Sequence, residues 1–219
     1  MLTFNDVKKN ETIRTYIKMA DAALSELGYT DHSLAHVAKV ADTAKYILST
    51  LNYSERDIEL GQIASFMHDI GNIVNREEHA QSGAVMAFRL LDQLGASPEE
   101  NAIIISAIGN HDEGTAIPVN PIAAALILAD KTDVRRSRVR NNDLSTFDIH
   151  DRVNYAVEES QVTISSDKKK FQLSLKIDTA MSPVMDYFEI FLNRMLLCKK
   201  AAHRLDMVFE LKINEQSVL

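Results

Sequence analysis

The chain has 219 residues and a formal net charge of −7, with 46% hydrophobic and 25% charged residues. This composition is typical of a folded globular protein with one domain of ordinary size plus a small addition, and it excludes a disordered chain. Seven glycines and four prolines are few for this length, which favours long helices. No glycine pair has the spacing of a dinucleotide-binding or phosphate-binding loop.

The apolar runs and the cysteine content restrict the environment of the protein. The longest unbroken apolar run covers residues 122–129, far short of the ~20 residues that span a bilayer. The first ten residues lack the apolar core of a secretory signal. The single cysteine, Cys198, excludes an internal disulfide and a multi-cysteine zinc site. We therefore expect a cytoplasmic protein with no membrane partner.

Helical periodicity of apolar residues dominates the first 140 residues. Gly28 is placed to end the first helix, and Asp31 or Ser33 and then Ser54 are placed to begin the next two. The pairs Ser97-Pro98 and Asn120-Pro121 are typical of helix starts. The expected helices cover residues 11–27, 33–51, 54–71, 80–94, 98–110 and 122–135. A mainly α fold follows, a helical bundle with short connections.

The pattern changes after about residue 147. Residues 161–166 and 171–177 alternate in hydropathy and predict a β-hairpin, residues 183–204 predict a long helix, and residues 205–213 alternate again. We expect a small antiparallel sheet with one helix across it, a β-β-α-β arrangement. The predicted division is a helical domain at 1–147 and a small α+β segment at 148–219, which could cap a site or form a homodimer.

Five polar residues occupy positions that the helical periodicity buries: His36, His68, Asp69, His111 and Asp130. Each could have its own hydrogen-bond partner. Asp130 is the sharpest case, because an ionised carboxylate in an apolar helix is costly unless something binds it. Its neighbour Lys131 points about 100° away around the helix. One shared cation explains all five positions together, and bundles build metal sites from side chains of several helices.

His79, at the start of an expected helix, extends this set. It could be an exposed residue of a first helical turn. With His111 it could also supply a second metal ion, and Asp69 would then bridge the two ions.

His36, the His68-Asp69 dyad and Asp130, in this order on helices, resemble the HD superfamily of metal-dependent phosphohydrolases. The pair His79 and His111 resembles its binuclear branch. Within that branch, four stretches are similar to bacterial HD-type hydrolases of symmetrical diadenosine tetraphosphate: MHDIG at 67–71, HAQSGA at 79–84, GNH at 109–111 and LADKTD at 128–133. The resemblance covers residues 30–140 and implies an HD-domain helical bundle there.

The resemblance also implies roles. One metal ion would be held by His36, His68, Asp69 and Asp130, and a second by Asp69, His79 and His111. A metal-activated water would attack phosphorus, with Asp69, Asp130 and Lys131 as the catalytic residues. The resemblance favours iron or manganese, while the mixed imidazole and carboxylate ligands also suit zinc, cobalt or nickel.

Residues 131–140 contain five cations and one carboxylate in an otherwise acidic chain. They could be a solvated helix end, or they could bind phosphate beside the metal ions. We predict substrate binding by Lys131, Arg135, Arg136 and Arg138, and by His32, one helical turn before His36. The acidic net charge argues against a general nucleic-acid binder and favours a small phosphorylated substrate such as a nucleotide.

Three alternatives remain from the sequence. An HD-type di-iron oxygenase would use the same six ligands. A non-catalytic module could bind a nucleotide and signal through the C-terminal segment, and a structural metal protein would have no turnover.

Overall fold

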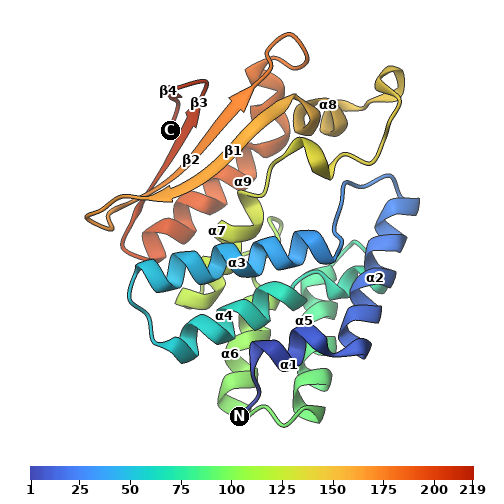
Figure 1. Ribbon diagram of the computed structural model, residues 1–219, viewed down its shortest axis with the longest axis vertical. Coiled ribbons are helices and arrows are strands. Elements are labelled where there is room, and N and C mark those ends of the chain that lie inside the picture. Colours follow the sequence, from blue (N-terminus) through green and yellow to red (C-terminus); the bar gives the residue numbers. More distant parts are fainter.

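A computed structural model describes residues 1–219, with nine α-helices and a four-stranded sheet. The helices form a bundle, and the sheet lies at the opposite end of the molecule from the N-terminus (Figure 1). The first seven helices are α1 Phe4–Lys9, α2 Glu11–Glu26, α3 Leu34–Thr50, α4 Glu55–Met67, α5 His79–Gln93, α6 Pro98–Gly109 and α7 Pro121–Lys131. After them come α8 Ile149–Ala156, β1 Val157–Ile164, β2 Lys170–Ile177, α9 Val184–Arg204, β3 Val208–Ile213 and β4 Gln216–Ser217. The mainly α class with a small α+β addition is confirmed.

The expected start signals act as helix caps. Ser33, Ser54, Ser97 and Asn120 each accept a hydrogen bond from a backbone N–H in the first turn of the helix that follows. Two ends differ from the prediction. The helix expected at 54–71 ends at Met67, and the helix expected at 122–135 ends at Lys131. The short helix α1 was not predicted; Thr3 begins it with a capping box.

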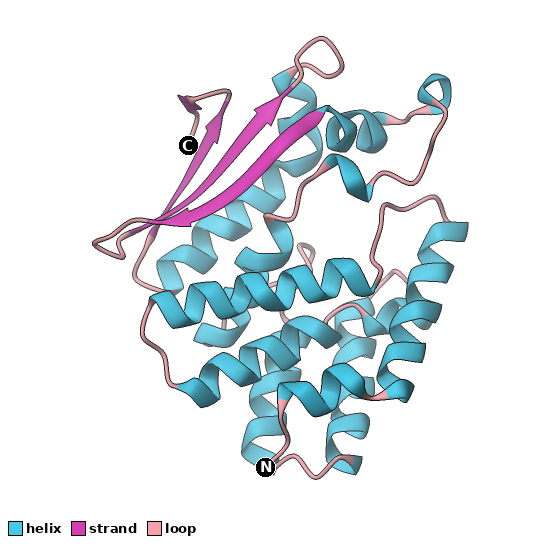
Figure 2. Cartoon of the chain, in the orientation of Figure 1, coloured by secondary structure: helices cyan, strands magenta, loops and turns pink.

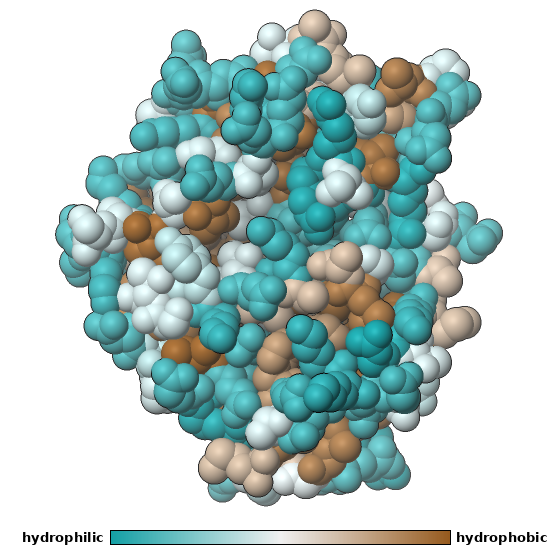
Figure 3. All heavy atoms as spheres, in the orientation of Figure 1, coloured by the Kyte–Doolittle hydropathy of each residue, from teal (hydrophilic) through white to brown (hydrophobic).

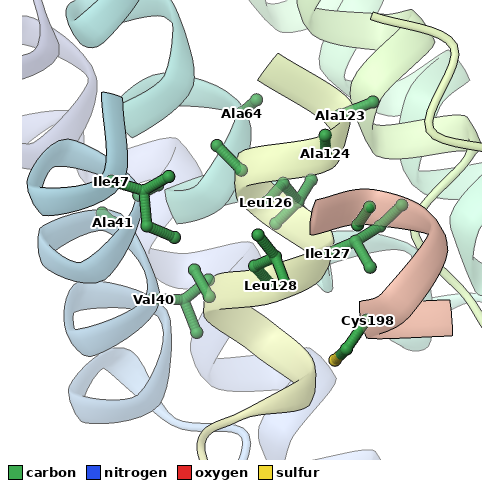
Figure 4. Packing of buried hydrophobic residues seen from close by; sticks show 14 of the residues in the cluster. Val40, Ala41, Ile47, Ala64, Ala123, Ala124, Leu126, Ile127, Leu128 and Cys198 are labelled. Carbon is green, nitrogen blue, oxygen red and sulfur yellow. The ribbon is translucent and has the colours of Figure 1, made fainter. Parts of the chain in front are cut away.

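Helix α7 is the centre of the bundle, with every residue from Ile122 to Ala129 buried. It packs against α3, α4 and α9. Figure 4 shows its side chains between Val40 of α3, Ala64 of α4 and Cys198 of α9. A helix that is apolar on all sides is stable only when it is enclosed. Its C-terminal end therefore delivers Asp130 into the interior of the protein.

The sheet is mixed, not wholly antiparallel as predicted. Its order is β1-β2-β3-β4; β1 pairs antiparallel with β2, but β2 and β3 are parallel, with Phe171 beside Phe209. The reason is the connection: α9 is a 21-residue helix, which carries the chain back along the sheet so that β3 starts beside the start of β2. β3 then turns into the short antiparallel strand β4.

Helix α9 lies between the sheet and the helical bundle (Figures 1 and 2). The inner faces of β2 and β3 bury Leu173 and Leu211 in the hydrophobic core that also contains Leu128 of α7. The secondary structure changes near residue 147, but the hydrophobic core continues across this point. The C-terminal segment is thus fixed against the bundle, close enough for α9 to reach the polar cluster described below.

The face of the molecule in Figure 3 is mostly hydrophilic, with hydrophobic side chains in small scattered groups. None of the helices has the length and apolar character that crossing a membrane requires.

Candidate metal centre

The His68-Asp69 pair lies where α4 ends and a short 3-10 helix, η1 (Ile70–Ile73), begins. Both side chains are buried. Asn72 fixes the aspartate, because its Nδ2 donates to the backbone carbonyl of Asp69 at 2.9 Å and to Oδ1 at 3.0 Å. Gly71 allows η1 to pack directly on the start of α5, which carries His79. Local backbone geometry therefore positions three of the clustered side chains.

Four histidines turn the same ring atom, Nε2, toward one another. The Nδ1 of each donates a hydrogen bond outward: His36 to Asp133 Oδ2 at 2.8 Å, His68 to the Ser65 carbonyl at 2.7 Å, His79 to the Arg76 carbonyl at 3.0 Å and His111 to the Ile108 carbonyl at 2.6 Å. Since carbonyl and carboxylate oxygens only accept, Nδ1 carries the proton in each neutral ring. Each Nε2 then presents a lone pair to the interior, as metal-binding histidines do.

One group of ligand atoms surrounds His36 and His68. The Nε2 of His36 lies 3.3 Å from Asp130 Oδ1 and 3.8 Å from Asp69 Oδ2. The Nε2 of His68 lies 3.1 Å from Asp69 Oδ2 and 3.6 Å from Asp130 Oδ1. The structure thus brings together two imidazoles from α3 and the end of α4 and two carboxylate oxygens from different segments.

The second group faces the other oxygen of Asp69. Oδ1 of Asp69 lies 3.5 Å from the Nε2 of His79 and 3.9 Å from the Nε2 of His111. The two Nε2 atoms are 3.2 Å apart. Asp69 therefore presents one carboxylate oxygen to each histidine pair.

These atoms fit a divalent cation. Metal–nitrogen and metal–oxygen bonds of ~2.0–2.2 Å place neighbouring ligands ~3.0–3.4 Å apart, close to the shorter separations in both groups. The Nε2 atoms of His36 and His68 are buried and have no hydrogen-bond partner. Lone pairs that face each other at 3.2 Å, as in His79 and His111, also need a positive charge between them. The residue set is consistent with divalent-metal binding.

The charge at the cluster favours a cation as well. Burial lowers the pKa of the His68 ring, but the Asp69 and Asp130 carboxylates beside it together raise that pKa to about 10, so its Nε2 carries a proton unless a bound cation displaces it. Burial would raise the pKa of Asp69, yet pairing with His68 holds it well below its usual range. Two ionised carboxylates in the interior therefore attract a positive charge, which a metal ion can supply.

Lys131 lies closer to this centre than its helix angle predicts. Its Nζ is 2.7 Å from Asp130 Oδ2 and 3.7 Å from Glu113 Oε1. The expectation that Lys131 points away from Asp130 was wrong, because α7 ends at Lys131 and the long side chain folds back over the last turn. Burial lowers the pKa of Lys131, but Asp130 and Glu113 raise it above its ordinary value, so the amine is charged.

The basic run that follows divides into two groups. Arg138 is buried and lines the same cavity as Asp69 and Lys131, where its guanidinium donates to the backbone carbonyls of Asp31 and Asp133.

Arg135 and Arg136 do not line that cavity. Arg135 pairs with Asp133 at 2.8 Å, and Arg136 donates to the Tyr155 carbonyl and stacks on its ring. The helix expected to run to Arg135 ends at Lys131, and the predicted role of both arginines in substrate binding is not supported by their position.

His32 lines the cavity, and its ring centroid lies 5.5 Å from that of His36, but it precedes the N-cap Ser33 and is not on α3 as predicted. The cavity also contains side chains that sequence reasoning missed. Arg76 lies with its Nη1 3.3 Å from the Nε2 of His79, and Arg194 reaches the cavity from α9. Asp133, within the stretch LADKTD, orients His36. Arg76 is only three residues before His79, which was a usable signal; Arg194 had none, because it is distant in sequence.

Several known proteins are similar to this chain over more than half of its length. The chain is 25% identical over 197 residues to an uncharacterized protein of Methanocaldococcus jannaschii, covering 80% of this chain and 75% of that protein. It is 26% identical over 134 residues to ribonuclease Y of Enterococcus faecalis, covering 60% of this chain but 24% of the ribonuclease. The chain therefore spans about a quarter of the length of that relative.

A solved structure described as a predicted HD superfamily hydrolase, from an uncultured Thermotogales bacterium, is similar with a TM-score of 0.46 and 23% identity. The match covers 57% of this chain and 67% of that one. The family model of the HD domain matches residues 33–144, slightly more than half of the chain. The four clustered histidines and the two aspartates all lie inside this range. The chain therefore belongs to the HD domain family, and this membership supports a metal-dependent phosphohydrolase in general.

Proposed function

We propose that this protein hydrolyses a phosphoester or phosphoanhydride of a small nucleotide-like substrate, with a water activated at a binuclear metal centre. One observation carries the proposal. Four imidazole Nε2 atoms and two carboxylates converge in the interior, and the cavity beside them is lined by the cations Arg76, Lys131, Arg138 and Arg194. These cations attract an anionic substrate. The imidazoles and carboxylates would hold the metal ions that activate the attacking water.

The assignment of ligands follows the two groups of atoms. His36, His68 and Asp130, with Oδ2 of Asp69, would hold one cation; His79 and His111, with Oδ1 of Asp69, would hold the other. Two bound cations of this kind lower the pKa of a water and clamp phosphate oxygens for in-line displacement. Iron or manganese suits the mixed imidazole and carboxylate set, and we favour them over zinc, cobalt and nickel.

The protein's own side chains supply orientation and charge. Asp130 has its Oδ2 engaged by Lys131, which fixes the carboxylate so that Oδ1 faces His36 and His68. Lys131 and Arg138 are both buried, so their charges act at low dielectric on any phosphate oxygen that enters the cavity. His32, at the cavity wall, can contact the substrate through its Nε2, because its Nδ1 donates to the Thr30 carbonyl at 2.6 Å.

The proposal is tested by incubating the full chain, loaded with Mn²⁺ or Fe²⁺, with a panel of substrates. The panel contains nucleoside monophosphates, nucleoside triphosphates, symmetrical diadenosine tetraphosphate and a short single-stranded RNA. The last two are included because of the motif resemblance and the match to ribonuclease Y. Phosphate release and product chromatography are the readouts. We expect turnover of at least one small nucleotide, lost on Asp69→Ala and retained in Asp92→Ala, which removes an exposed carboxylate of α5.

Two results would contradict this proposal and favour another function. Oxygen consumption without phosphate release would favour the di-iron oxygenase alternative. Tight nucleotide binding without turnover across the panel would favour a regulatory module.

A further inference from the structure

A second cavity adjoins the metal centre and is built by the C-terminal segment. Its volume is about 330 Å³, and it shares Thr30, His32, Arg76 and Arg194 with the cavity beside the ligands. Its other walls include His150, Asp151 and Asn154 of α8 and Phe191 of α9. These last four residues lie outside the HD match at 33–144. The two cavities therefore adjoin at the four shared residues, and the second, which we call the cleft, extends from there to α8.

Arg194 stands where the two cavities meet. Its guanidinium lies 4.6 Å from the centroid of the Phe191 ring, and its Nε pairs with Glu113. Glu113 also faces Lys131 at 3.7 Å. The ring and the carboxylate fix the plane of the guanidinium, and about a third of the side chain remains exposed toward the cleft. A guanidinium held along one edge can present its remaining N–H groups to a planar anion.

We propose that Arg194 binds the phosphate group of the substrate, and that α8 and α9 enclose a single nucleoside-sized group attached to it. This inference rests on the proposed phosphohydrolase function and adds to it the substrate class and the role of the C-terminal segment. The HD-type bundle would supply the metal ligands together with Lys131 and Arg138, and α9 adds Arg194 as a further phosphate ligand.

The charges along the cleft define what it accepts. The inner end carries Arg76 and Arg194, while Asp148 and Asp151 lie at the α8 end. The side chain of Asp148 is 66% exposed, which marks this end as the mouth. A chain of further phosphates leaving through the mouth would meet two carboxylates. A phosphomonoester whose organic group is neutral and can donate hydrogen bonds meets no such repulsion.

The volume of the cleft also suits a phosphomonoester with one organic group. A volume of about 330 Å³ lies at the lower end of the ~300–1,000 Å³ of small-molecule sites. Tyr29, 42% exposed at the cleft, offers aromatic surface to a base, while Phe191 is buried beneath Arg194 and supports that guanidinium.

The first experiment measures binding of inorganic phosphate to the full chain loaded with Mn²⁺, by isothermal titration calorimetry. Arg194→Gln removes the phosphate ligand, and Lys200→Gln is the matched control, since it removes one exposed cation from the same helix. We expect Arg194→Gln to raise the Kd for phosphate about 10-fold to 100-fold, the loss typical of a charge-assisted hydrogen bond. Lys200→Gln should bind as wild type does.

A double variant separates phosphate binding from a structural role. If Arg194 served only to neutralise Glu113, adding Glu113→Gln to Arg194→Gln would restore phosphate binding. We expect binding to stay weak. Restoration, or wild-type binding by Arg194→Gln alone, or no phosphate binding by the wild-type chain, would overturn the inference.

The second experiment tests the nucleoside-sized space with the phosphonate analogue of adenosine 5′-monophosphate, which is not hydrolysed. His150→Trp fills the mouth from an exposed position, where the side chain of His150 is 60% exposed. We expect the analogue to bind at least tenfold more weakly to this variant while inorganic phosphate binds unchanged. Equal binding of the analogue to variant and wild type, or tighter binding of an RNA decamer than of the analogue, would overturn the enclosed-substrate part.

These outcomes are independent of the reaction. Arg194-dependent phosphate binding without any turnover would contradict the proposed function and leave this inference standing. Turnover of a nucleotide with unchanged phosphate binding in Arg194→Gln would support the proposed function and overturn this inference.

Discussion

Replacing Gly71 with alanine should damage both stability and the second group of metal ligands. A Cβ at this position would lie 2.0 Å from the His79 carbonyl oxygen and 2.5 Å from the Gly83 nitrogen. Both atoms are backbone, so no side-chain rotation relieves the contact. The 3-10 helix and α5 must separate by about 1 Å or more, which is overpacking of a kind that costs about 1–3 kcal/mol. For a chain of this length, the melting temperature should fall by about 2–12 °C.

The same displacement moves His79 away from Asp69. Metal sites require ligand distances within about 0.2 Å, so a shift of about 1 Å should abolish binding of one cation while the ion between His36, His68 and Asp130 is retained. Thermal unfolding by circular dichroism and metal content by plasma mass spectrometry are the readouts. Gly109→Ala is the control, since its Cβ would meet Ala84 at an ordinary 3.6 Å. Wild-type stability and metal content in Gly71→Ala would refute this reasoning.

Three further predictions concern other parts of the molecule. Asn72→Ala removes both hydrogen bonds that fix Asp69 and should weaken metal binding about 10–100-fold in a competition titration with a chelator; unchanged affinity would contradict it. The hydrogen bonds from Arg56 lower the pKa of Glu100, so this ion pair stabilises the fold above the ordinary pKa of 4.5 and its stabilisation is lost as the pH falls. Glu100→Gln should lower the free energy of unfolding by about 0.5–1 kcal/mol at pH 7. Equal urea midpoints of the variant and the wild type at pH 7 would refute this prediction. Burial raises the pKa of the Cys198 thiol, so a disulfide reagent should label it at the rate of unfolding, and fast labelling of the native protein would argue against this packing.

The helical part of the fold could be predicted because its signals are local. Ser97 and Asn120, each followed by proline, cap their helices as the sequence indicates. The apolar run of α7 predicts burial on every side, which the structure shows. The convergence of polar residues was also accessible, since a carboxylate such as Asp130 at the end of that run requires a partner.

The remaining features depend on contacts between distant segments. Strand alternation is the same in parallel and antiparallel pairs, so the parallel pairing of β2 with β3 depends on the path of α9. Lys131 pairs with Asp130 because a long side chain can fold back, which the angle between helix positions does not describe. Arg194 reaches the cavity only through packing of α9 on α7.

The same limit applies to the basic run. Arg135 and Arg138 are three residues apart, yet one pairs with Asp133 at the edge and the other enters the cavity. The turn after Lys131 decides this, and its shape comes from long-range hydrogen bonds between Arg138 and the Asp31 segment. Composition alone predicts a basic stretch near a bound phosphate. Tertiary contacts determine which of its arginines lines the cavity.

The most direct test of this account is the metal stoichiometry of the full chain and of Asp69→Ala. The protein is purified without added metal, titrated with Mn²⁺, and analysed by plasma mass spectrometry after desalting. We expect two cations per wild-type chain and none in Asp69→Ala, because each oxygen of that carboxylate faces one pair of histidines. A wild-type chain that binds no divalent cation, or an Asp69→Ala variant that retains both, would contradict the central claim.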